Sequence, residues 1–189
     1  MEIIRAEALS EADREADFSF EIDHVVTEPF HAVPLRVAPS APRTKNHGLD
    51  GGLFEHFDGT ERVLFVAREA GDLAGYLAAS RGWNGCSVID DFAIARRFRR
   101  RGLSTALMRA AVDWTREAGL GMIRLETQSS NVVACKFYQR FGFVLGGYDR
   151  LLYHELDADM SDEVALFWYL DIGSRQRVTG LSRPPPRHG

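Results

Sequence analysis

The segment Ala95–Leu107, ARRFRRRGLSTAL, carries the residue types that bind an anion. It joins an apolar run to the start of an amphipathic stretch, so we expect a strand that leads into a helix N-terminus. The first N–H groups of a helix lack intrahelical partners and lie at the positive end of its dipole. Arg99, Arg100 and Arg101 add charge, Gly102 allows close backbone approach, and Ser104 and Thr105 add hydroxyl donors. The pattern predicts a phosphate or pyrophosphate site, and the alternative is a solvated basic helix cap.

Regular elements on both sides would position this loop. Val88–Ala95 is apolar on both faces, which is typical of a central strand. Leu103, Leu107, Ala110 and Trp114 recur at helical spacing, which predicts a helix over 102–118. Further elements are a strand at Gly121–Gln128 and a helix at 131–141, with Ser130 as its expected cap.

The remaining pattern completes an α/β chain with a mixed sheet and a crossover helix. Residues 27–60, rich in Pro and Gly, are expected to form loops with at most short elements. A short helix is expected at Glu11–Phe18, and strands are expected at Met1–Glu7, Arg62–Arg68, Leu73–Ser80, Phe143–Leu145, Leu151–Glu155 and Val164–Leu170, with Gly146-Gly147 as a turn. Residues 1–172 are expected to form one domain, and the basic, Pro-rich residues 173–189 a disordered tail.

Composition excludes several classes of protein. The 189 residues are 45% hydrophobic, which is typical of a globular protein. The net charge of −4 argues against a protein whose whole surface binds nucleic acid. No apolar run approaches the ~18 residues that span a bilayer, so no membrane partner is expected. The chain shows no secretory signal and has two cysteines, Cys86 and Cys135, which favours a cytoplasmic location.

The loop and its surroundings resemble the GNAT family of N-acetyltransferases. Arg99-x-x-Gly102-x-Ser104 is similar to the family's acetyl-coenzyme A motif, although the family usually has Gly or Ala where this chain has Ser104. The resemblance covers about residues 60–170, and its other parts are Phe92-Ala93-Ile94 and the motif Asn131-x-x-Ala134-x-x-Phe137-Tyr138-x-x-x-Gly142-Phe143.

This resemblance implies a single-domain GNAT fold. Its mixed central sheet would be flanked by helices, and splayed central strands would hold acetyl-CoA as co-substrate. The cofactor-binding residues that it implies are Phe92, Ala93, Ile94, Arg99, Arg100, Arg101, Gly102, Leu103, Ser104, Thr105, Asn131, Ala134 and Tyr138.

Within this superfamily the C-terminal half is most similar to the streptothricin acetyltransferases. The resemblance lies in residues 124–156 and 163–170, which include LETQ, ACKFY, GGYD and LFWY, and Asp90-Asp91 stands where those enzymes tend to have Glu-Asp. It implies a small cationic amine as substrate, with the β-lysine amine of streptothricin as the first expectation. Alternatives are a polyamine, a protein amine or an acyl-CoA-binding domain without turnover. A homodimer is a common arrangement among relatives.

Acetylation of an amine requires a proton acceptor, because an ammonium ion with a pKa near ~10 has no lone pair for attack. Glu126, on the polar face of its strand, is the first candidate for the base, and its alternative is a structural hydrogen-bond acceptor. Asp90 and Asp91 are expected on opposite faces of their strand, so at most one reaches a given site, as a base or as a ligand for the substrate cation. The resemblance assigns Tyr138 as the acid for the leaving thiolate, and a backbone N–H near Ala93 or Ile94 to the thioester oxygen.

Several other residues are weighed against a packing role. Trp83, Tyr148 and Trp168 could line a pocket for a cation or belong to the core, and Asp149 could add a carboxylate. Cys135 is interpreted as a small packed residue. The residues His47, Asp50, Glu55 and His56 match no zinc spacing, so no metal is expected. The five arginines within 96–101 lack the aromatic pattern of a nucleic-acid binder.

Overall fold

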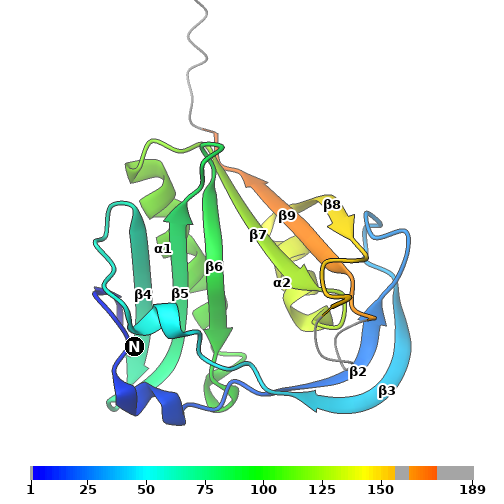
Figure 1. Cartoon of the computed structure of the whole chain (residues 1–189), viewed down its shortest axis with the longest axis horizontal. Helices are drawn as coiled ribbons and strands as arrows, with labels where there is room; N and C mark the ends of the chain where they lie inside the picture. Colours follow the sequence, from blue (N-terminus) through cyan, green and yellow to red (C-terminus); the bar gives the residue numbers. More distant parts are fainter. Residues whose placement is uncertain (1, 156–161, 174–189) are drawn as a thin grey trace, which may run out of the picture.

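Seven strands form one mixed sheet in the order β1-β4-β5-β6-β7-β9-β8, and two further strands form a separate ribbon. The computed structural model describes residues 2–155 and 162–173. Strands of the main sheet are β1 (Glu2–Ala6), β4 (Arg62–Glu69), β5 (Asp72–Arg81), β6 (Ser87–Ile94), β7 (Met122–Gln128), β8 (Val144–Asp149) and β9 (Ala165–Asp171). Helices are α1 (Leu103–Glu117) and α2 (Val132–Phe141), with short 3-10 turns η1 (Glu11–Glu15), η2 (Gly51–Phe54) and η3 (Arg96–Phe98). The mixed α/β sheet flanked by helices is therefore confirmed (Figure 1).

Strands β6 and β7 are parallel neighbours only at their first residues. Ser87 pairs with Ile123 and Val88 with Arg124, and no pair follows beyond these in the described chain. Farther along, the two strands diverge like the arms of a V (Figure 1). The splayed central strands expected from the resemblance are thus present, and the unpaired backbone edges lie in the middle of the sheet.

Helix α1 packs on the sheet beside this opening. Leu103, Leu107 and Trp114 of the predicted stripe are buried, whereas Ala110 is half-buried. Met108 and Ala111, which the stripe did not include, are fully buried. The helix crosses over between β6 and β7, as a parallel pair requires. Within the described residues, no helix is both long and apolar enough to cross a bilayer.

The ribbon of β2 (Phe20–Val26) and β3 (Val37–Lys45) was not expected from the sequence, which predicted mainly loops over 27–60. Pro39 and Pro42 argue against a strand, but β3 pairs on one side only, with β2, so it needs fewer backbone donors. The expected helix at 11–18 is a 3-10 turn of five residues. In Figure 1 the ribbon curves below and to the right of β7 and β9, and β2 contacts α2.

The C-terminal strands differ from the prediction. Gly146 and Gly147 do not form a turn but lie inside β8, which pairs with β9. A Cβ at Gly146 would collide with the ring of Tyr169, so the glycine lets that ring cross the strand. The predicted strand Leu151–Glu155 is a turn instead. Apart from Gly173, the predicted tail at 173–189 lies outside the described residues.

Candidate active site

The loop before α1 leaves backbone donors free. Gly102 has a φ of +80° and Arg100 a φ of +63°, so the chain turns sharply before the helix begins. The first helical bond runs from the N–H of Ala106 to the carbonyl of Gly102. In the described chain the N–H groups of residues 102–105 therefore have no backbone acceptor. Nothing lies within 4 Å of the Cβ position at Gly102, so the backbone here is open to an anion.

The three arginines of the loop have different roles. Arg99 turns inward, and its guanidinium donates to the carbonyls of Ile94 and Phe18 at 3.0 Å each. Burial lowers the pKa of Arg99, and the neighbouring Arg96 adds to the shift. Arg101 pairs with Glu69 at 3.0 Å on the surface. Arg100 is exposed and has no side-chain partner in the described chain, so it is the arginine free to meet a phosphate.

A bulge in the β5–β6 pair places Asp90 and Asp91 on the same side of the sheet. The register shifts between Ala78 and Ala79, which pair with Asp91 and Ile89, so Asp90 is the extra residue. Both aspartates consequently line one cavity of about 480 Å³. The expectation that they point to opposite faces was wrong, because strict alternation fails at a bulge.

Asp91 is held by two hydrogen-bond donors. The Tyr76 hydroxyl donates to Oδ2 at 2.9 Å, and His47 Nε2 lies 2.8 Å from Oδ1. Asp90 accepts a hydrogen bond from the Ser80 hydroxyl at 2.9 Å. Burial raises the pKa of Asp90, although the Ser80 contact and Arg62 act in the opposite direction. His47 and Tyr76 did not stand out in the sequence as partners of Asp91.

Glu126 lies across the opening on β7. It accepts a hydrogen bond from the Tyr153 hydroxyl, which in turn receives one from Gln128. Burial of the carboxyl raises the pKa of Glu126, while the Tyr153 bond and the charge of Lys45 lower it. Lys45 is itself paired with the buried Glu163 at 2.7 Å. The surroundings thus favour a carboxyl that takes up protons more readily than a free glutamate.

Tyr138 lies on α2 behind these carboxylates and is 6% exposed. Its ring packs against Trp168, which is core, and its hydroxyl makes no hydrogen bond in the described chain. Burial raises the pKa of Tyr138, and the nearby Cys135, Asp91 and Glu126 add to the shift. The charges of Asp91 and Glu126, which lie on the two separated strands, thus add to the effect of burial and help to keep this phenol protonated at neutral pH.

The start of α2 corrects one expectation. Asn131, not Ser130, caps the helix, and its side-chain oxygen accepts the N–H of Ala134 at 3.1 Å. Ser130 instead donates to Glu163 at 2.7 Å. Cys135 is fully buried, and burial raises the pKa of its thiol to about 12, which fits a packed residue.

The other expected substrate contacts are not brought together. Trp83 is 97% exposed in the connection between β5 and β6, at the end of β6 away from the opening, and does not line the cavity that contains Asp90 and Asp91. The Tyr148 ring packs at a tilt against Phe30, and the Arg150 guanidinium already lies over both rings. The Asp149 carboxylate accepts a backbone N–H two residues ahead. A cation therefore finds no open aromatic cage in these residues.

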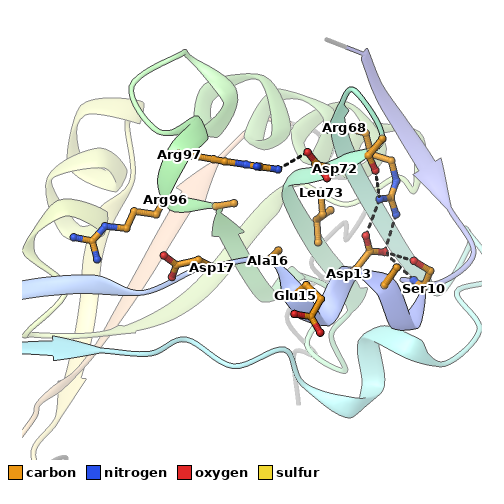
Figure 2. A pocket seen from close by; sticks show the side chains of 13 residues that line it. Ser10, Asp13, Glu15, Ala16, Asp17, Arg68, Asp72, Leu73, Arg96 and Arg97 are labelled. Carbon is orange, nitrogen blue, oxygen red and sulfur yellow. Dashed lines mark hydrogen bonds and ion pairs between the residues drawn. The ribbon is translucent and has the colours of Figure 1, made fainter.

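Another cavity, about 570 Å³, lies elsewhere, between η1, the β4–β5 turn and η3. Figure 2 shows Asp13 between Ser10 and Arg68, and Arg97 extended toward Asp72. Asp13 and Arg68 are thus paired, and so are Asp72 and Arg97. The cavity borders the start of the segment Ala95–Leu107, and it contains none of the carboxylates Asp90, Asp91 and Glu126.

The residues present fit acetyl-CoA in three respects. Free N–H groups at 102–105 suit a pyrophosphate, the unpaired edges of β6 and β7 suit an amide-containing arm, and the partnerless hydroxyl of Tyr138 suits a sulfur atom. Among the described residues, no group of three or more His, Cys, Asp or Glu side chains could hold a metal ion.

Comparison with known proteins agrees with this geometry. The model of the acetyltransferase (GNAT) family matches residues 33–143. Streptothricin acetyltransferase A of Bacillus subtilis (strain 168) is 31% identical over 130 residues, 69% of this chain and 74% of its own. Streptothricin acetyltransferase of Streptomyces lavendulae is 36% identical over 141 residues, which cover 71% and 72% of the two chains.

A solved structure extends the likeness to nearly the whole chain. It is a protein of Bacillus anthracis str. Ames, assigned as a streptothricin acetyltransferase and crystallised with acetyl coenzyme A. The TM-score is 0.75 at 29% identity, with 92% of this chain and 99% of that chain covered. The chain therefore belongs to the GNAT family and is an acetyl-CoA-dependent N-acetyltransferase.

Proposed function

We propose that the protein is a cytoplasmic enzyme that acetylates the β-lysine amine of streptothricin and so protects its host from this antibiotic. The observation that carries the proposal is the cavity of about 480 Å³ that Asp90 and Asp91 line together. These carboxylates supply negative charge for a cationic amine, and the charges of Asp91 and Glu126 also act on the phenol of Tyr138, a proton donor. The streptothricin acetyltransferases similar to this chain support that choice of amine.

Binding of the two substrates uses opposite sides of the opening. The N–H groups of 102–105 and the guanidinium of Arg100 hold the pyrophosphate, and the edge of β6 from Phe92 to Ile94 lies along the pantetheine arm. Asp90 and Asp91 hold the ammonium groups of the acceptor through charge-assisted contacts. Asn131 orders the start of α2, which presents Tyr138.

Group transfer then needs one base and one acid. Acetyl-CoA supplies a thioester whose carbonyl carbon is attacked directly by the amine in a ternary complex. Glu126 removes a proton from the nitrogen, directly or through water, and Tyr138 gives its proton to the departing sulfur. A backbone N–H near Ala93 or Ile94 stabilises the negative charge on the carbonyl oxygen.

The test is coenzyme A release with streptothricin beside spermidine, lysine and an aminoglycoside. We expect the highest kcat/KM with streptothricin, and we expect cells that express the protein to survive the antibiotic. Glu126→Gln should lose much of this protection. Efficient acetylation of spermidine or a peptide amine, without protection, would contradict the streptothricin assignment and leave the acetyltransferase intact.

A further inference from the structure

His47 is a titratable side chain at the acceptor side that the proposed reaction does not use. It lies beyond the end of β3, in the segment that covers the sheet, and it lines the cavity of about 480 Å³ with Asp90 and Asp91. Its Nε2 is 2.8 Å from Asp91 Oδ1. The side chain is 40% exposed, so it reaches both the cavity and water.

The contacts of Asp91 define which nitrogen of His47 is available. The Tyr76 hydroxyl donates to Oδ2, so the carboxylate is oriented from the opposite side. A carboxylate only accepts hydrogen bonds, so Nε2 of His47 carries the hydrogen, and in the neutral ring Nδ1 keeps its lone pair. In the described chain Nδ1 has no partner. Asp91, oriented by Tyr76, thus contacts His47 in the way that the carboxylate of a catalytic triad contacts its imidazole and fixes the tautomer.

The stoichiometry of acetylation requires two proton acceptors. An ammonium ion enters with three protons on nitrogen, and the amide product of a primary amine keeps one. One of the two protons lost balances the proton that Tyr138 gives to sulfur, and the other leaves for water. Glu126, bonded to Tyr153, can serve one of these transfers.

We propose that His47 takes the first proton, from an ammonium group of the acceptor that lies on the Nδ1 side of its ring, and passes it to solvent. This inference rests on the proposed binding of the acceptor in the cavity lined by Asp90 and Asp91. The lone pair of Nδ1 accepts the N–H proton, the nitrogen of the substrate regains its lone pair, and Asp91 stabilises the imidazolium. An imidazole suits this step because Nδ1 can accept a proton while the N–H of Nε2 stays bonded to Asp91. Asp91 and Tyr76 are positioning residues in this step.

The experiment compares two acceptors in His47→Gln. One is the amine that the parent acetylates best, whether streptothricin or spermidine, and the other is its alkoxyamine analogue, which is neutral at pH 7. We expect kcat for the amine to fall about 10²-fold, in the range of general base catalysis. Turnover of the alkoxyamine should change by no more than a few fold, because it arrives without the first proton. His56→Gln, an exposed histidine of the same covering segment, is the control and should keep both rates.

Two outcomes would overturn the proposal. One is an equal loss with both acceptors, and the other is an unchanged kcat with a raised KM, which would limit His47 to binding. Retention of the thermal shift with acetyl-CoA shows that the variant is folded. Should His47→Gln not fold, Tyr76→Phe replaces it, with an expected loss of about 10-fold confined to the amine and the same contrary outcomes. If streptothricin is not a substrate, the same comparison can be made with spermidine, so the role of His47 is tested separately from the proposed function.

Discussion

At the scale of single residues, burial sets how strongly Tyr138 and Glu126 bind a proton, because the ionised form of each side chain loses its contact with water. Burial raises the pKa of each, so Tyr138 stays a donor and Glu126 becomes a stronger acceptor than a free carboxylate. Neither property belongs to the residue type alone. Both follow from the strands and the helix that surround the opening.

Tyr138→Phe removes the donor and keeps the ring that packs on Trp168. We expect kcat to fall about 10²- to 10⁴-fold, with little change in the KM for acetyl-CoA. Steady-state and single-turnover kinetics check this. Tyr148→Phe, whose hydroxyl makes no hydrogen bond in the described chain, is the control. An unaltered kcat with chemistry rate-limiting would exclude Tyr138 from the mechanism.

Glu126→Gln should act on activity and on stability in different ways. Turnover falls, and the loss shrinks as pH rises because neutral amine accumulates. The raised pKa means that the folded carboxyl binds its proton more tightly than the unfolded one, whose ordinary value is 4.5. Ionisation above the folded pKa therefore costs stability, and this cost is absent below pH 4.5.

Thermal unfolding as a function of pH measures that cost. We expect the Tm of Glu126→Gln to exceed that of the parent at pH 7–8, and the difference to narrow as pH falls toward 4.5. Glu2→Gln, an exposed carboxyl on β1, should show no such divergence. A Tm below the parent at neutral pH would mean that the carboxylate is stabilised where it lies.

At the scale of elements, the N-terminus of α1 combines a backbone conformation with a charge preference. Gly102 adopts φ +80°, which costs other residues roughly 1–2 kcal/mol, with Asn tolerating it best. No side chain fills the space above it. Conformation and anion binding can therefore be separated by the choice of substitution.

Gly102→Asp should abolish the thermal stabilisation by acetyl-CoA, because it sets a carboxylate against the pyrophosphate. Gly102→Asn has nearly the same shape without charge and should keep a reduced shift. Differential scanning fluorimetry at increasing acetyl-CoA concentration measures both, since a ligand of the folded state raises Tm. Equal shifts in the two variants would place the pyrophosphate elsewhere.

At the scale of the whole molecule, the β2–β3 ribbon is joined to the main sheet through Glu163. This carboxylate is 4% exposed and meets Arg43 and Lys45 of β3 and the Ser130 hydroxyl. The Val26 N–H also donates to the carbonyl of Ser129 at 2.8 Å. The ribbon leads into the segment that carries His47, so its attachment positions one wall of the acceptor side.

Glu163→Gln should lower the free energy of unfolding by about 1–3 kcal/mol, because it weakens charge-assisted contacts in a buried place. It should also raise the KM for the amine more than that for acetyl-CoA. Urea unfolding and substrate titrations test the two effects. Glu21→Gln, which removes an exposed partner of Arg96 on the same ribbon, should stay within about 0.5 kcal/mol of the parent. Unchanged stability of Glu163→Gln would mean that other contacts hold the ribbon.

Local signals in the sequence were enough to locate α1, β7 and α2 and the arginine-rich connection that precedes α1. Each depends on a periodicity or a glycine within a few residues, as with Leu107 in its helical stripe and Gly102 before it. The motif around Tyr138 likewise lies within one helix and its caps. The tertiary structure alone decided the acceptor side. His47 meets Asp91 from 44 residues away, and Tyr153 meets Glu126 from 27.

The bulge that brings Asp90 beside Asp91 is a property of strand pairing, and so are β2, β3 and the course of β8 through Gly146. Contacts between distant segments set such pairings, and no window of neighbouring residues contains them.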